Sequence, residues 1–240
     1  MPSAPRTARE RVREAMSGEI LAVARRQVAE QGAAALSLRS VARDLEMAPS
    51  ALYRYFDGRD ALLSALILDA YESLAAEAEQ AAEAAEGTGG DLERWFVVPG
   101  ALRAWALAHP HEWGLIFGAP VPGYHAPEAT VEPYARIAVE LVRPVAEAQE
   151  AGRLKPVRVS EETVTNAVAA AVAPVTDGLF PDLPAGAMPT AVVVRTVEAF
   201  ATLIGVISLE VFGHWRNTIL GPAEFFDATV SDAGTAIGLA

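Results

Sequence analysis

Apolar residues recur at helical spacing along most of the chain. Ile20, Ala24 and Val28 lie four residues apart and Gly32 follows where such a helix would end, so the pattern predicts a helix over about 8–31. No segment alternates between apolar and polar residues as a half-buried strand does. The chain is therefore expected to be all-α. Further helices are expected over 59–86, 91–108, 111–117, 128–151, 160–179, 189–215 and 222–237, separated by turns rich in Pro and Gly.

Two short helical patterns, joined by three residues, occupy residues 37–56. Ser37 is suited to cap the first, and Pro49 is placed where the first turn of the second tolerates it. The second pattern runs from Pro49 to Phe56. This arrangement is typical of a helix-turn-helix, although a helical hairpin with a solvated outer face has the same spacing. The apolar positions of the two helices are Leu38, Val41, Ala42 and Leu45, then Leu52 and Phe56.

The free face of the second helix is suited to DNA. A major groove admits one helix, Ser50 and Ala51 are small enough for close approach, and Arg54 has the length to reach a base edge or a phosphate. Arg59 follows at the start of the long helix, where a helix N-terminus favours anions such as phosphate. The candidate DNA contacts are Ser37, Arg39, Ser40, Pro49, Ser50, Ala51, Tyr53, Arg54, Tyr55 and Arg59.

The charge distribution separates the first quarter of the chain from the rest. The whole chain has 19 basic and 31 acidic residues, a net charge of −12, which excludes coating by nucleic acid through bulk electrostatics. Residues 1–60 nevertheless carry ten arginines against eight acidic residues. Only this part is therefore suited to approach a polyanion. The absence of cysteine excludes disulfides, thiolate zinc sites and a cysteine nucleophile.

The segment from Leu36 to Leu45 (LSLRSVARDL), followed by Pro49 to Phe56 (PSALYRYF), resembles the tetracycline-repressor (TetR) family over about residues 10–75. The most specific part is Leu52 to Phe56, followed by Arg59 and the pair Leu62-Leu63. The resemblance implies phosphate contacts for Tyr53 and Arg59, base contacts for Arg39 and Ala51, and core positions for Leu52 and Phe56.

Two positions depart from the family pattern. Glu46 stands where the family usually has a turn glycine, and it places a negative charge near DNA. Ala48 replaces a common Ser or Thr cap, which weakens the second helix by about 1 kcal/mol.

The resemblance also implies a homodimer whose C-terminal helical domain binds a small molecule. The expected domains are a helix-turn-helix domain over 1–58 and a ligand-binding and dimerisation domain over 59–240, joined by the long helix. Gly205, Ser208 and Gly213 in the last two helices suit close helix packing, in a dimer or within one chain. The motif from Phe212 to Trp215 (FGHW) resembles a Trp/His/Gly-motif subtype of the family.

Aromatic residues in the second domain suggest an apolar effector, although ordinary core packing uses the same residues. The loop over 118–127 is either an entrance or a plain surface loop. The candidate ligand contacts are Trp95, Arg103, Trp105, Trp113, Phe117, Tyr124, Asp177 and Phe200, with Phe96, Phe180 and Thr202 as further candidates.

Nothing in the sequence favours an enzyme, a cofactor or a membrane protein. The cluster from His109 to Glu112 could hold a metal, but Pro110 breaks the helical spacing between its two histidines. No secretory signal begins the chain, and the most apolar stretch, from Ala191 to Phe212, contains charged residues. A cytoplasmic location is expected.

The sequence thus predicts a ligand-responsive transcriptional regulator, a repressor, that binds a pseudo-palindromic operator as a homodimer and is released by a small apolar effector. A helical adaptor for other proteins, without sequence-specific DNA binding, is the alternative. The two differ in whether Arg39, Tyr53 and Arg59 are needed for function.

Overall fold

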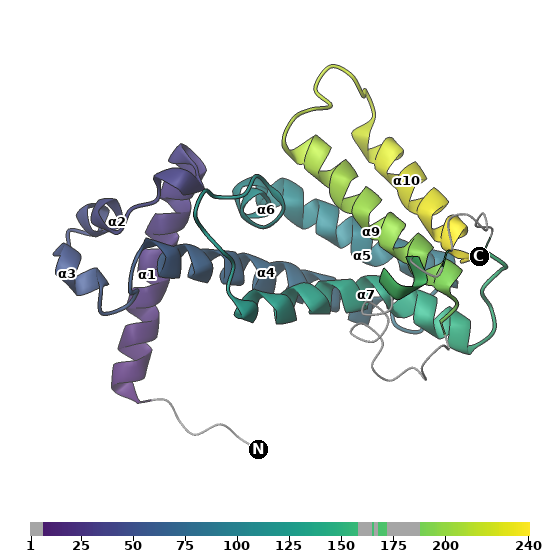
Figure 1. Cartoon of the computed structure of the whole chain (residues 1–240), viewed down its shortest axis with the longest axis horizontal. Coiled ribbons are helices and arrows are strands. Elements are labelled where there is room, and N and C mark those ends of the chain that lie inside the picture. Colours follow the sequence, from purple (N-terminus) through teal and green to yellow (C-terminus); the bar gives the residue numbers. More distant parts are fainter. Residues whose placement is uncertain (1–6, 158–164, 166–167, 172–187) are drawn as a thin grey trace. The chain divides into compact units, whose positions relative to one another are not determined.

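The computed structural model describes residues 7–157, 165, 168–171 and 188–240 (Figure 1). Every regular element in these ranges is helical, which confirms the all-α prediction. The α-helices are α1 (Ala8–Gln31), α2 (Leu38–Asp44), α3 (Pro49–Leu52), α4 (Arg59–Ala84), α5 (Asp91–Ala108), α6 (Pro110–Phe117), α7 (Val131–Glu150), α9 (Thr190–Val211) and α10 (Pro222–Ile237). Two short 3₁₀ helices are η1 (Ala33–Ala35) and η2 (Glu128–Thr130). Of the helix expected over 160–179, the structure describes 165 and 168–171, and the latter are helical.

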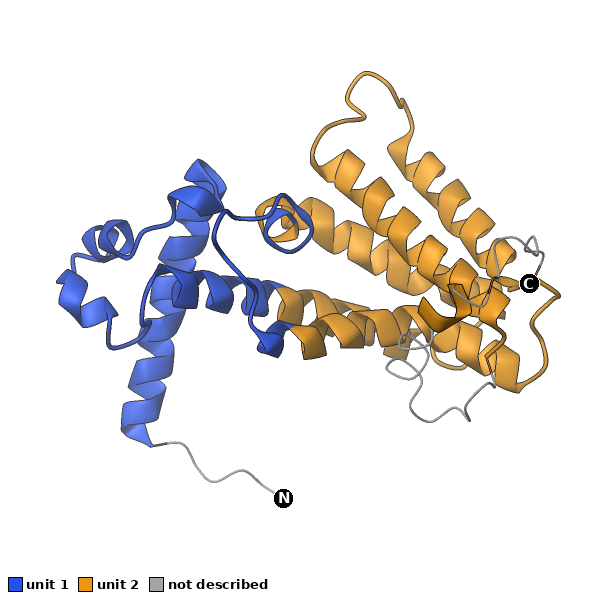
Figure 2. Ribbon diagram, in the orientation of Figure 1, with its two compact units in different colours: residues 1–70, 114–130 blue, residues 71–113, 131–240 orange. Residues whose placement is uncertain are grey.

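The chain forms two compact units (Figure 2). Unit 1 comprises residues 1–70 and 114–130, and unit 2 comprises residues 71–113 and 131–240. The boundaries between the two units therefore fall within α4, within α6, and between η2 and α7. The boundary expected after Gly58, between the helix-turn-helix domain and the ligand-binding domain, stays a prediction.

The core of unit 1 forms where α1, α2 and the first turns of α4 bring their apolar faces together. Ile20, Val41 and Leu63 are fully buried, as is Leu52 of α3. At the start of α1, the Thr7 hydroxyl accepts a hydrogen bond from the Glu10 backbone N–H (3.2 Å). The Glu10 carboxylate in turn accepts a hydrogen bond from the Thr7 backbone N–H (2.7 Å). This reciprocal capping box satisfies two N–H groups that the helix leaves without partners.

In unit 2, α5 packs against α7, α9 and α10, and the indole of Trp95 lies at the contact with α10. Trp95 Nε1 donates to the Val230 carbonyl (2.9 Å). Gly234 faces the same indole, and a β-carbon there would lie 2.7 Å from Trp95 Cδ1 and from Leu92 Cδ1. A glycine is therefore what allows α5 and α10 to approach so closely.

Helix α9 ends earlier than the sequence predicted. The expected helix continued to Trp215, but α9 ends at Val211 and Gly213 has a φ of +75°. The His214 N–H donates to the Leu209 carbonyl (2.9 Å), five residues back, which closes the helix in a left-handed turn that glycine adopts without strain. By length and apolar composition α9 would suit a membrane, but it carries Arg195 and packs on α5 and α10.

Candidate functional site

The turn between α2 and α3 reverses the chain through one left-handed residue. Glu46 has a φ of +54°, and the N–H of Met47 donates to the Ala42 carbonyl (2.9 Å), five residues back. This is the usual hydrogen bond at a helix end that is closed by glycine. A residue with a β-carbon is strained in this conformation by about 1–2 kcal/mol. Glu46 therefore occupies a backbone conformation that favours glycine, the residue that the family usually has at this position.

Helix α3 is shorter than the sequence predicted. It was expected to reach Phe56 but ends at Leu52, and turns follow. The N–H groups of Arg54 and Tyr55 donate three residues back, at 3.3 and 2.8 Å, so the chain tightens instead of continuing as an α-helix. No side chain caps α3, since Ala48 occupies the N-cap. Ser37 also occupies the N-cap of α2, but its hydroxyl accepts no capping hydrogen bond, contrary to expectation.

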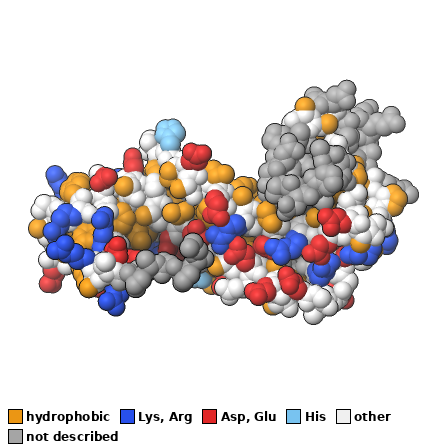
Figure 3. Space-filling view, turned by 90° about the horizontal axis from the view of Figure 1, so that it is seen from below, with side chains coloured by type: hydrophobic (Ala, Val, Ile, Leu, Met, Phe, Trp, Pro, Cys, Tyr) orange, Lys and Arg blue, Asp and Glu red, His pale blue; other side chains and the backbone are white. Residues whose placement is uncertain are grey.

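The candidate DNA contacts all belong to unit 1 but differ in exposure. Those that are exposed are Arg39, Pro49, Ser50, Tyr53 and Arg54. Those that are half-buried are Ser37, Ser40, Ala51, Tyr55 and Arg59. Tyr53 is 53% exposed although it is a large aromatic residue. In Figure 3, basic side chains gather at the left-hand end of the view, over unit 1. Acidic and basic side chains are mixed over unit 2.

The Ser40 hydroxyl takes part in a network that holds α2 on α1. Gln27, which is only 4% exposed, donates to Ser40 Oγ (3.0 Å) and to Asp44 Oδ2 (2.9 Å). Arg43 also donates to Ser40 Oγ (2.9 Å). Sequence reasoning missed Gln27, because a glutamine on a helix face gives no sign of the partners it meets on another helix. The network fixes the orientation of α2 and therefore of the turn that follows it.

Arg59 binds backbone carbonyls of its own unit. Its guanidinium donates to Leu36 O (3.1 Å) and to Ala33 O and Ala34 O (both 3.2 Å). It also pairs with Asp60 at 3.3 Å. Arg59 thus ties the start of α4 to η1 and the segment before α2. A phosphate contact by Arg59 stays a prediction, and its role in positioning α2 was not anticipated.

Arg13 of α1 is a second residue that sequence reasoning missed. Its guanidinium donates to the Arg54 carbonyl, just after α3, at 3.4 Å. Arg25, further along α1, forms an ion pair with Asp69 of α4. Helix α1 therefore contacts α2, the end of α3 and α4, and supports the whole helix-turn-helix.

The candidate ligand residues lie in both units. Trp95, Trp105 and Trp113 are buried in unit 2, and their indole N–H groups donate within that unit, to Val230 O, Ser73 Oγ and Ser208 Oγ at 2.9, 3.0 and 3.0 Å. Buried indoles with satisfied N–H groups are what core packing requires. Phe117 and Tyr124 belong to unit 1, where the Tyr124 hydroxyl lies 2.9 Å from Ser64 Oγ.

The remaining candidates have defined neighbours in unit 2. Arg103 forms a two-pronged ion pair with Glu210 (2.7 and 2.6 Å), which raises the pKa of the guanidinium, and it also lies over the ring of Phe226. Phe200 is half-buried, with its ring edge-to-face with Tyr134 at 6.0 Å. Asp177 and Phe180 lie outside the described residues. The ligand contacts stay predictions.

Two family models match this chain. The model described as bacterial regulatory proteins, tetR family, matches residues 20–66. The model described as tetracyclin repressor-like, C-terminal domain, matches residues 95–233. Together they cover the helix-turn-helix and most of unit 2.

Individual proteins match over nearly the whole chain. The HTH-type transcriptional regulators Rv1816 of Mycobacterium tuberculosis and Mb1846 of Mycobacterium bovis are each 34% identical over 221 residues, which is 90% of this chain and 89% of theirs. The crystal structure of regulatory protein SCO4313 is 35% identical, with a TM-score of 0.75, and the match covers 95% of this chain and 98% of that one. A tetR-family regulatory protein from Rhodococcus RHA1, 16% identical with a TM-score of 0.61 over 93% and 97% of the two chains, shares the fold.

Proposed function

The chain belongs to the TetR family of bacterial transcriptional regulators, and from this membership we propose that it is a ligand-responsive repressor that binds a pseudo-palindromic operator as a homodimer. Its relatives are DNA-binding regulators and not enzymes. The observation that carries the proposal is the helix-turn-helix of α2 and α3, with Arg39, Ser50 and Tyr53 exposed. Because a repressor acts on the chromosome, we place the protein in the cytoplasm.

In the proposed complex α3 enters the major groove. Ser50 and Ala51 allow close approach, and Arg39 reads a base edge from the neighbouring helix. Tyr53 donates its hydroxyl to a phosphate, and Arg54 binds a phosphate or a base edge. Two such heads in a dimer read half-sites that are about 34 Å apart, or a multiple of that distance.

We place the dimer contact on α9 and α10. Several large apolar side chains on these helices and the loop between them are exposed in the single chain: Leu209, Phe212, Leu220 and Phe225. Leu220 is 99% exposed, and the burial of such groups against a second copy would stabilise the dimer. The exposure of these apolar side chains supports a dimer contact here, and a dimer agrees with the assembly expected for the family.

The effector acts through α4 in this proposal. Helix α4 contains residues of both units, so a change in unit 2 that moves α4 also changes how the two α3 helices are presented. An apolar small molecule that binds unit 2 then favours the state that does not bind DNA. A coupling free energy of about 1–3 kcal/mol suffices.

Substitution of Arg39 tests the proposal on a duplex that the wild-type protein selects. We expect Arg39→Ala to weaken binding by about 1–3 kcal/mol and to relax the sequence preference, because a base contact is lost. Lys155→Ala is the control, since it removes one positive charge from an exposed position of unit 2 that lies outside the helix-turn-helix and outside α9, α10 and the loop between them. Fluorescence anisotropy titrations measure both. Equal affinities for the two variants would contradict the proposed role of Arg39.

A further inference from the structure

The outer turns of α1, residues 8–15, extend beyond the core of unit 1. Every buried residue of this helix lies at or after Ile20, and the side chains over residues 8–15 are all exposed. Val12 is 67% exposed although it is apolar. Figure 1 shows these turns projecting past the other helices of unit 1. Because most helices in proteins are stabilised by the packing of an apolar face, a helical start that buries nothing needs other support.

Two sets of contacts support the outer turns. The capping box of Thr7 and Glu10 fixes the start of the helix, and its hydrogen bonds lower the pKa of the Glu10 carboxyl. Closer to the core, the Arg13 guanidinium donates to the Arg54 carbonyl (3.4 Å), in the turn that follows α3. The outer turns thus lie beside the end of α3, the helix that we place in the major groove.

Arg9 lies on the same face of α1 as the buried residues. One stripe of the helix, with residues three or four apart, consists of Arg9, Arg13, Met16, Ile20, Val23 and Gln27. From Ile20 onward this stripe is buried, and at Arg13 it reaches the turn after α3. Its two arginines come where the helix has left the core. Arg9, one turn before Arg13 and about 6 Å from it along the helix axis, extends the stripe past the end of α3.

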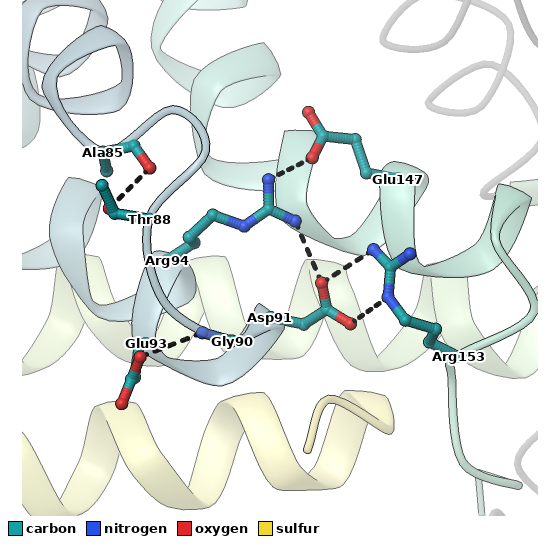
Figure 4. A network of polar contacts seen from close by, with 8 residues as sticks. All are labelled: Ala85, Thr88, Gly90, Asp91, Glu93, Arg94, Glu147 and Arg153. Carbon is teal, nitrogen blue, oxygen red and sulfur yellow. Dashed lines mark hydrogen bonds and ion pairs between the residues drawn. The ribbon is translucent and has the colours of Figure 1, made fainter.

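The Arg9 side chain is exposed and binds no carboxylate or carbonyl of the residues that the structure describes. Arginines in unit 2 differ from it. Arg94 binds Asp91 and Glu147, and Arg153 binds Asp91 as well (Figure 4). Such ion pairs balance the charge of a guanidinium and use its donors. Arg9 keeps both its charge and its donors for a partner outside the chain.

A phosphate of the DNA backbone suits this position. Guanidinium groups bind phosphate through charge-assisted hydrogen bonds, and more than half of the hydrogen bonds between proteins and DNA go to phosphates and sugars. The turn after α3 exposes Tyr53 and Arg54, for which we also propose phosphate contacts. With α3 in the groove, a long basic side chain just past this turn lies next to the backbone that borders the groove.

We propose that Arg9 binds a backbone phosphate of the operator, so that the outer turns of α1 form a DNA contact outside the helix-turn-helix. Arg13 is the positioning residue, because it joins the outer turns to the chain after α3. The inference rests on the proposed function, since it requires α3 in the major groove. A phosphate contact carries no base information, so Arg9 contributes to affinity and not to sequence preference.

Fluorescence anisotropy titrations of the full-length protein with its selected operator test this contact. We expect Arg9→Ala to weaken binding about three- to tenfold, and to lower the slope of log Kd against log salt concentration by about 1, because one phosphate loses its partner. Arg11→Ala is the matched control, since it removes the same charge from an exposed position on another side of the same helix. It should leave both quantities nearly unchanged. Arg9→Ala should select the wild-type consensus and have wild-type stability in urea.

Operators that carry one neutral methylphosphonate linkage, placed at each backbone position in turn, identify the phosphate. We expect one linkage that weakens binding by the wild type and by Arg11→Ala but not by Arg9→Ala, because that variant has already lost the contact. A scan without such a linkage would overturn the inference.

Equal affinities and equal salt slopes for Arg9→Ala and Arg11→Ala would also overturn it, while operator binding by the wild type would still uphold the proposed function. A changed consensus for Arg9→Ala would show that Arg9 reads a base and not a phosphate. A protein that selects no operator contradicts the proposed function itself, and the inference falls with it.

Discussion

At the scale of single residues, Glu46 shows how one position sets the geometry of the helix-turn-helix. Its φ of +54° is accessible to glycine without strain but not to a residue with a β-carbon. The hydrogen bond from Met47 to Ala42 nevertheless holds the turn in this conformation. The surrounding packing therefore outweighs the local strain, and the strain reduces the stability of the domain.

We predict that Glu46→Gly raises the free energy of unfolding by about 1 kcal/mol, because the left-handed strain is relieved. Urea denaturation measures the change. Glu46→Ala is the control, since it removes the charge but keeps the β-carbon, and it should give little gain. A glycine variant that is less stable than the wild type would show that Glu46 is not strained in solution.

Single residues also mark where sequence reasoning stopped. The buried face of α1 and the fully buried Leu52 followed from periodicity, because apolar side chains at helical spacing have few alternatives to the core. Gln27 and Arg59 did not follow. Their partners, Ser40 and the carbonyls of η1, come into reach only when separate helices have packed, and no local pattern encodes that.

At the scale of helices, the sequence predicted the helix ends correctly where glycine or proline marks them. The ends of α1, α5 and α10 agree with the predicted ranges. A glycine lies directly beside at least one end of each of these helices, and glycine is a strong signal for a helix boundary. The ends of α3 and α9 were wrong by four residues each, because tight turns replaced a last helical turn there. Periodicity alone does not distinguish a tight turn from a helical one.

The contact between α5 and α10 predicts opposite effects for two glycine substitutions. Gly234→Ala should lower the free energy of unfolding by about 1–3 kcal/mol, since its β-carbon would lie 2.7 Å from atoms of Leu92 and Trp95. Gly100→Ala, on the exposed side of α5 with no atom within 4 Å of the added carbon, should raise it by about 0.5–1 kcal/mol. Thermal and urea unfolding measure both. Equal effects in the two variants would contradict the close packing of α10 on Trp95.

The ion pairs at the start of α5 predict a dependence of stability on pH. Arg153, and after it Arg94, lower the pKa of Asp91 below its ordinary value of 3.8. A depressed pKa means that the stabilisation is present above the ordinary pKa and is lost as the pH falls through the folded-state pKa. Asp91→Asn should therefore be less stable than the wild type at neutral pH, and the difference should shrink below about pH 4.

Urea unfolding at a series of pH values checks this prediction. Glu77→Gln, at an exposed position of α4, controls for the loss of one negative charge. A stability difference between the wild type and Asp91→Asn that does not change with pH would mean that Asp91 is not held by the two arginines.

At the scale of the whole molecule, the two units carry different features of the proposed repressor. Unit 1 carries the exposed Arg39 and Arg54 and the turn that positions α3, and unit 2 carries the buried tryptophans and the two last helices. Membership of the TetR family followed from motifs in the first quarter of the chain. The effector did not follow, because aromatic residues that pack a core and those that line a pocket have the same spacing in the sequence.

The proposed function requires two copies of the helix-turn-helix to read a pseudo-palindrome. Selection of bound duplexes from a random DNA pool, at near-physiological salt so that non-specific phosphate binding is suppressed, tests whether they do. We expect an enriched consensus with two inverted half-sites whose centres are one helical turn of DNA, or a multiple of it, apart. A correctly folded, dimeric protein that enriches no sequence, or only a single unpaired half-site, would contradict it.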